Sequence, residues 1–205
     1  MDTRQHSTQD RIIDGLIQCI KEKPVREITN KDIYTKAEVT YQTFFRYYSD
    51  KNELLDDLEN TLISELRTAF KKDRDILTKL KHTPNKDEML TLTDPTFRHI
   101  FSFCDANKKI LRVLLSQNGD LLFVRKLQNV AEKEFIIRAQ YLSKGIELNS
   151  QDILLIKTYT TQVMTLIENW LFFSDSISQK RITEIIGEVQ IISPFEVLKG
   201  KSKIE

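Results

Sequence analysis

Turn-forming residues are scarce along this chain, and that scarcity constrains its fold more than any other feature. Only five Gly and four Pro occur among its 205 residues. Proteins built from β-strands need many more such residues at their turns, so the count favours long helices. With 40% hydrophobic and 30% charged residues, the chain has the balance of an ordinary folded protein of one or two domains. The sequence therefore predicts an all-α fold.

The first 50 residues contain three signals for the start of a helix. Two have the capping-box form Ser/Thr-x-x-Asp, and the third is a Thr that precedes an aromatic run. Apolar residues after the first signal recur at helical spacing until Pro24. The signals predict a head of three helices, the third covering 41–47. They stand at Ser7, Thr29 and Thr40.

The rest of the chain is predicted to be helical with one long interruption. Asp50-x-x-Glu53 starts a long helix that reaches at least Phe70. The polar segment 81–94 is expected to be a loop, with Asp94-Pro95 starting the next helix. Further helices are expected over about 95–104, 106–116, 120–143, 151–174 and 178–190. We therefore expect about nine helices, in a head over 1–50, a larger helical body over 51–190 and a tail over 191–205.

The head has the form of a helix-turn-helix, in which two short helices pack on a longer one. The second short helix of this motif can enter the major groove of DNA. Such a position explains the aromatic run, because a ring can pack on a thymine methyl and Gln42 can pair with adenine. Phe44 and Tyr48 are expected in the core of the head. Hydroxyl groups and Lys side chains can contact phosphates. The candidate DNA-binding residues are Thr29, Lys31, Thr40, Tyr41, Gln42, Thr43, Tyr47 and Lys51.

Charge alone does not predict DNA binding. The chain has a net charge of +1, and residues 1–48 carry eight Lys or Arg against seven Asp or Glu. Binding would therefore depend on where the charges lie, with a modest dependence on salt. The alternative interpretation of Tyr41, Gln42 and Tyr47 is a solvated helix face.

The same residues resemble the signature of the TetR family of bacterial transcription regulators. The matching elements, in the family's order, are ITNKDI at 28–33, AEVT at 37–40, TFFRYY at 43–48 and DKNELL at 50–55. The stretch VLLSQNGD at 113–120, followed by Phe123, resembles the subgroup around regulators of dihydroxyacetone kinase genes. The family usually has a phosphate-contacting Tyr where Phe45 stands, so that contact is assigned here to Tyr47. The resemblance implies a dimer whose helical body binds a ligand.

The last two predicted helices carry apolar residues on two sides, which indicates burial on both. One side would pack within its own subunit and the other on a partner, in a four-helix bundle; the alternative is a core within one chain. The candidate dimer-interface residues are Ile156, Val163, Ile167, Trp170, Ile182 and Ile186. The body could also enclose a ligand pocket, although each aromatic residue there could be ordinary core. The candidate pocket residues are Phe97, His99, Phe101, Phe123, Tyr159 and Gln162.

The sequence gives no support for catalysis. His6, His82 and His99 are scattered without metal-ligand spacing, and neither a Gly-rich phosphate loop nor a nucleophile elbow occurs. Asp73 and Asp75 are expected at a solvated helix end. We therefore expect no enzyme activity, no cofactor and no metal site.

Three observations predict a cytoplasmic protein. Cys19 and Cys104 lie far apart in apolar stretches, which suggests buried thiols in a reducing compartment. The polar N-terminus is unlike a signal peptide, and no apolar run has the length of a membrane span.

Three functions remain open. The leading hypothesis is a homodimeric transcription regulator that binds palindromic operator DNA, as a repressor released by a small-molecule effector. The second keeps the DNA-binding head but places it under the control of a protein partner, as a regulator or activator. The third is a helical interaction module that does not bind DNA.

Overall fold

The protein was analysed as a computed structural model, which describes residues 7–144, 146–174 and 176–190. Within these ranges the chain forms nine α-helices and no strand, which confirms the predicted all-α class and the number of helices. None of these helices is long and apolar enough to cross a bilayer. The chain divides into two compact units, one of Met1–Ser64 with Lys109–Val124 and one of the remaining residues. The predicted tail over 191–205 lies outside the described residues.

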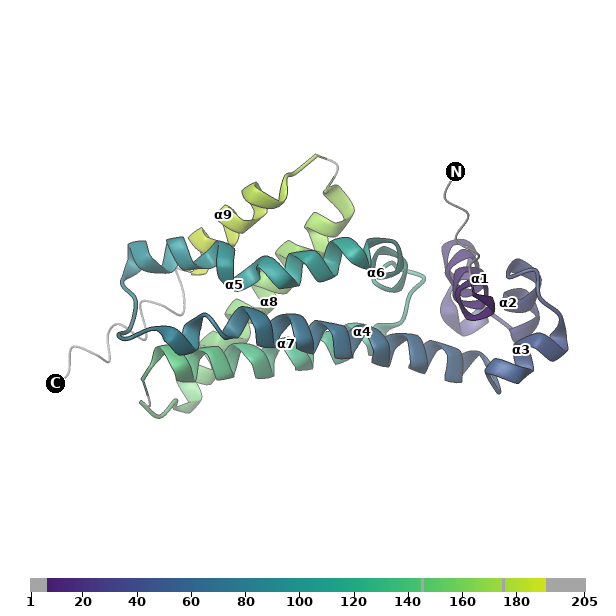
Figure 1. The fold of residues 1–205 in the computed structure, drawn as a ribbon, viewed down its shortest axis with the longest axis horizontal. Helices are drawn as coiled ribbons and strands as arrows, with labels where there is room; N and C mark the ends of the chain where they lie inside the picture. The colour runs from purple at the N-terminus through teal and green to yellow at the C-terminus, as the bar shows by residue number, and fades with distance from the viewer. Residues whose placement is uncertain (1–6, 145, 175, 191–205) are drawn as a thin grey trace. The chain divides into compact units, whose positions relative to one another are not determined.

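The first unit contains the three predicted head helices, drawn in purple and blue in Figure 1. The capping boxes at Ser7 and Thr29 are both formed, and the Thr40 hydroxyl accepts a hydrogen bond from Thr43 N at 3.1 Å. The first two helices approach closely at Gly15, where an added Cβ would lie 2.8 Å from the Ile33 carbonyl oxygen. The helical segments of this unit are α1 (Thr8–Glu22), a 3₁₀ turn (Val25–Glu27), α2 (Asn30–Lys36), α3 (Tyr41–Tyr47), the first part of α4 (Lys51–Arg74), α6 (Lys108–Leu114) and the start of α7 (Leu121–Leu142).

The turn between α2 and α3 is held by a side chain of α1. Glu38 has a φ of +52°, a left-handed conformation that is uncommon for a residue other than Gly. The Arg11 guanidinium donates hydrogen bonds to the carbonyls of Ala37 at 3.0 Å and Glu38 at 2.5 Å. These two bonds fix the turn, and with it the direction in which α3 leaves α2.

The second unit is built from the longer helices. They are the end of α4, a 3₁₀ turn (Leu77–Lys79), α5 (Lys86–Ala106), most of α7, α8 (Ser150–Phe173) and α9 (Gln179–Gln190). The last helix packs along α5 and against α8 (Figure 1). Its Gly187 faces α5, where an added Cβ would lie 3.0 Å from Thr93 Oγ1. The four helices predicted after residue 105 lie within two residues of their expected limits.

The expected loop over 81–94, and the helix start at Asp94-Pro95, are wrong. The helix α5 begins at Lys86 and continues through Pro95. Its true start is the capping box of Asn85 and Glu88, in which the Asn85 side chain accepts from Glu88 N at 3.0 Å. Pro95 has no N–H to donate within a helix. Side chains of two neighbouring helices bind the backbone of α5 just beyond this proline, as described below.

Candidate functional site

The start of α3 presents its side chains to solvent. Tyr41 is 60% exposed, and the adjacent Gln42 is exposed as well. The Tyr41 ring lies edge-on to Tyr34, with ring centroids 6.1 Å apart, and 4.4 Å from the Phe45 ring. These neighbours orient the Tyr41 ring while most of its surface stays accessible. Further along the helix, Tyr47 is 36% exposed.

Two other aromatic residues of this stretch anchor the helix. Phe44 is fully buried and Tyr48 is 4% exposed, which confirms that both belong to the core of the head. The Tyr48 hydroxyl donates to Asp57 Oδ2 at 3.4 Å, and burial raises the pKa of this phenol. The aromatic run therefore serves two purposes, since part of it packs inward and part of it remains on the surface.

Several candidate phosphate contacts also have structural roles within the head. The hydroxyls of Thr29 and Thr40 cap α2 and α3, and Thr40 Oγ1 lies 2.9 Å from Thr43 Oγ1. The Lys51 ammonium donates to the Val25 carbonyl at 2.9 Å. The remaining four candidates, all of them exposed, are Lys31, Tyr41, Gln42 and Tyr47.

The start of α2 depends on one ionised carboxylate. Asp32 Oδ2 accepts hydrogen bonds from Lys23 Nζ at 2.8 Å, from Thr29 N at 2.7 Å and from Thr29 Oγ1 at 2.7 Å. These hydrogen bonds, that from Lys23 first, lower the pKa of Asp32 to about 2. The carboxylate thus ties α2 to the segment that follows α1.

Replacement of Asp32 by Asn is expected to weaken the acid sensitivity of the head. Because the native pKa lies below its ordinary value, the carboxylate stabilises the fold above pH ~4, and this contribution is lost as the pH falls toward 2. With the side chain 32% exposed, we expect a loss of only about 1 kcal/mol at pH 7. Urea unfolding followed by circular dichroism at pH 7 and pH 3 measures this, with the exposed Glu38→Gln as control. If the free energy of unfolding differs between pH 7 and pH 3 by as much in Asp32→Asn as in the wild-type protein, the prediction is wrong.

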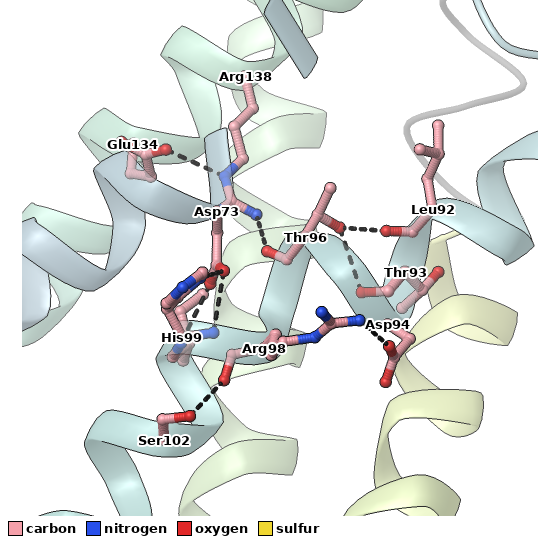
Figure 2. A network of polar contacts seen from close by, with 11 residues as sticks. Asp73, Leu92, Thr93, Asp94, Thr96, Arg98, His99, Ser102, Glu134 and Arg138 are labelled. Carbon is pink, nitrogen blue, oxygen red and sulfur yellow. Dashed lines mark hydrogen bonds and ion pairs between the residues drawn. The ribbon is translucent and has the colours of Figure 1, made fainter. Parts of the chain in front are cut away.

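A buried carboxylate joins two helices in the second unit (Figure 2). Asp73, at the end of α4, is fully buried, so the expectation of a solvated helix end is wrong for this residue, whereas Asp75 is exposed. It accepts hydrogen bonds from His99 N at 2.9 Å, His99 Nδ1 at 2.7 Å and Ile100 N at 3.0 Å. Two of these donors are backbone N–H groups that lie four and five residues after Pro95. Asp73 therefore binds the backbone of α5 directly after the proline.

A second polar group binds the backbone of α5 near Asp73 (Figure 2). Arg138 of α7 donates from Nε to Glu134 Oε1 at 3.0 Å and from Nη1 to the Thr96 carbonyl at 2.9 Å. Glu134 also forms an ion pair with Arg74 of α4. Burial raises the pKa of Glu134, and the two guanidinium groups oppose that effect. Together, the two polar groups connect α4, α5 and α7.

Two buried polar atoms beside this network lack a hydrogen-bond partner within the described part of the chain. They are Nη2 of Arg138 and the hydroxyl of Tyr159. Both side chains pack near the Phe135 ring, whose centroid lies 5.3 Å from the Arg138 guanidinium carbon and 5.4 Å from the Tyr159 ring. Buried polar groups are nearly always bonded, so two such atoms around one ring mark a candidate ligand site.

The predicted pocket residues are only partly brought together. Phe97 and Tyr159 lie in the aromatic cluster around Arg138 and Phe135, and His99 is bound to Asp73. Phe101 packs instead on Trp170, with ring centroids 5.0 Å apart. Phe123 is buried in the first unit, and Gln162 is exposed on α8.

Sequence reasoning missed Arg138, Glu134 and the role of Asp73. Charged residues on a helix are normally taken as surface. The spacing of Glu134 and Arg138, four residues apart, predicts an ion pair but not its burial.

The predicted dimer-interface residues lie in the core of the second unit. Ile156, Val163, Trp170, Ile182 and Ile186 are all buried in a single chain, and Ile167 is half-buried. The Trp170 indole N–H donates to the Ile177 carbonyl at 3.0 Å. The apolar side chains that α8 exposes are others, namely Leu154 (65%), Phe172 (40%) and Phe173 (58%).

Comparisons with known proteins agree with this architecture. Residues 93–191 match the family model TetR_C_8, described as a transcriptional regulator C-terminal region. The chain is also similar to a solved structure, that of the fatty acid degradation regulator FadR from Bacillus halodurans. The TM-score is 0.54 at 15% identity, with 97% of each chain covered, and at that identity the likeness shows the fold alone. No curated protein matches the sequence.

Proposed function

We propose that this TetR-like transcriptional regulator is a cytoplasmic homodimer that binds palindromic operator DNA through α3 and is released from it by a small molecule. The observation that carries the proposal is the exposed start of α3, where Tyr41 and Gln42 face solvent while Phe44 anchors the helix. Arg11 fixes the turn before α3. A helix held in this way, with its first residues exposed, suits the recognition position of a helix-turn-helix.

A titration of the purified protein with DNA from upstream of its own gene tests this proposal. We expect a complex that survives competition by unrelated DNA, measured by fluorescence anisotropy. Its affinity should fall only modestly with salt, because Lys23, Lys36 and Lys51 bond groups within the head while Lys31 is exposed. A dimer without any specific complex would favour the helical interaction module instead. A DNA complex that dissociates only when a protein partner is added would favour control by a protein partner, the second hypothesis.

The side chains on the face that α8 exposes to solvent support the proposed dimer better than the buried apolar residues that the sequence predicted for the interface. Leu154 and Phe172 stand at the two ends of this face. Between them, the exposed Thr158 and Thr161 donate their hydroxyls to the carbonyls of Leu154 and Lys157, both at 3.0 Å. Because these hydroxyls are bonded to the backbone of their own helix, the methyl groups of the two threonines are available to pack against a partner. Such a face can meet its copy in a two-fold contact.

Replacement of Thr161 by Glu is expected to weaken the dimer at least tenfold, a change of about 1.4 kcal/mol. A two-fold contact places the new charge in the interface twice, and charged residues are depleted at interface centres. Sedimentation velocity over a range of protein concentrations measures the dissociation constant. The control is Asn129→Glu, an exposed position of α7. Equal dissociation constants for the two variants would place the interface elsewhere.

Release from DNA is proposed to act through α4, the helix that contributes to both units. A ligand that prefers one arrangement of the second unit shifts the population toward it by its difference in affinity. The end of α4 takes part in that arrangement through Asp73, which binds α5, and Arg74, which pairs with Glu134 of α7. A ligand that alters these contacts would change the position of α4.

A further inference from the structure

We propose that the second unit binds a small, largely apolar carboxylic acid, whose carboxylate is held by Nη2 of Arg138 and the hydroxyl of Tyr159. The inference rests on the proposed function, since this acid would be the effector. It is carried by the two buried polar atoms that have no partner among the described residues, on residues that are each 4% exposed.

The donors at this site define the chemistry of the ligand's polar end. Arg138 already uses Nε for Glu134 and Nη1 for the Thr96 carbonyl, so Nη2 is the nitrogen left to donate. Burial raises the pKa of Tyr159, which keeps its hydroxyl neutral and able to donate. A guanidinium N–H and a phenol O–H require an acceptor. A carboxylate is the acceptor that gains most from a charged donor.

The surroundings define the rest of the ligand. The Arg138 guanidinium carbon lies 5.6, 5.5 and 5.3 Å from the ring centroids of Phe70, Phe97 and Phe135. A molecule that reaches Nη2 therefore meets aromatic rings with the remainder of its surface, so its body should be apolar.

A groove lined mainly by cationic side chains lies beside two neighbours of Arg138. It lies between the end of α4 and α7 and has a volume of about 250 Å³. Four cationic side chains line it, Arg67, Lys71, Arg74 and Lys133, against one carboxylate, and a cleft with an excess of one sign of charge concentrates ions of the other sign. Phe70 and Glu134 also line the groove, and both contact Arg138. The groove thus favours an anion over a neutral ligand.

Entry of the acid would be coupled to α4. Nη2 of Arg138 and the hydroxyl of Tyr159 are both buried, so the rings that cover them must move before a ligand can reach them. One of these rings, Phe70, belongs to α4. Binding would therefore change the packing of the helix that the second unit shares with the first.

The test uses 3-phenylpropionate and hexanoate as probes, each compared with its neutral amide, by isothermal titration calorimetry. We expect saturable binding of at least one acid to the wild-type protein, with its amide at least tenfold weaker. In Tyr159→Phe the affinity for the acid should fall at least tenfold. The melting temperature of the ligand-free variant should be unchanged or higher, because the removed hydroxyl had no partner. Tyr141→Phe, an exposed tyrosine of α7, should behave as wild type.

Several outcomes would overturn the inference. They are the absence of saturable binding by either acid, equal binding of acid and amide, unchanged affinity in Tyr159→Phe, and a lower melting temperature of the ligand-free variant. The last would show that the hydroxyl is bonded, for instance to a buried water. Operator binding without probe is measured on the same samples. Normal operator binding without binding of either acid would contradict this inference alone. Binding of an acid without any operator binding would contradict the proposed function.

Discussion

Asp73→Ala is expected to destabilise the second unit by about 3 kcal/mol. The substitution removes the acceptor of three hydrogen bonds, two of them from the backbone N–H groups of His99 and Ile100. These donors lie just after Pro95, and the bond from Ile100 is buried. Loss of the acceptor of a buried donor costs about 1–3 kcal/mol, and loss of the half-buried bond from His99 N adds to that cost. Guanidinium unfolding followed by circular dichroism measures the change.

A neighbouring aspartate provides the matched control for this prediction. Asp75 lies just beyond the end of the same helix and is exposed. Asp75→Ala should change stability by less than about 0.5 kcal/mol. Asp73→Asn should fall between the two, because an amide keeps one acceptor oxygen. If Asp73→Ala and Asp75→Ala unfold at the same denaturant concentration, the buried carboxylate does not support α5.

The difference between α3 and α5 shows what local sequence can predict. The limits of α3, Tyr41–Tyr47, were predictable because Thr40 caps the helix through a hydrogen bond to Thr43 three residues later. The start of α5 was missed because Asp94-Pro95 has the form of a helix start, although the true cap is at Asn85. Just after its proline, the helix backbone is bound by Asp73 and Arg138, two residues that are distant in the sequence. No local pattern contains that information.

The second unit shows a different limit to what the sequence can predict. Apolar residues at helical spacing on α8 predict burial, but not which molecule covers them. Ile156, Val163 and Trp170 proved to be covered by their own chain. The proposed ligand site was partly predictable, since aromatic residues such as Phe97 and Tyr159 gather there. Its charged member, Arg138, was not, because burial of an arginine depends on partners that only the fold supplies.

The double substitution Tyr41→Ala with Gln42→Ala is expected to weaken operator binding at least 100-fold without unfolding the head. Each side chain that reads a base edge contributes about 1–3 kcal/mol, and a dimer presents both residues twice. About 2.7 kcal/mol already corresponds to a factor of 100. Stability should change little, because both side chains are exposed and the helix is anchored by Phe44. Fluorescence anisotropy at a fixed salt concentration gives the dissociation constants.

The matched controls separate base contacts from phosphate contacts and from general surface effects. Gln18→Ala removes an exposed glutamine of α1 and should leave operator binding unchanged. Lys31→Ala should weaken binding to operator and unrelated DNA alike, because a phosphate contact carries no sequence information. It should reduce the salt slope by about two, one for each subunit of the dimer. The double variant should instead lose most of the discrimination between operator and unrelated DNA. A double variant that keeps wild-type discrimination would show that α3 does not read the bases, and sequence recognition would then have to come from another part of the chain.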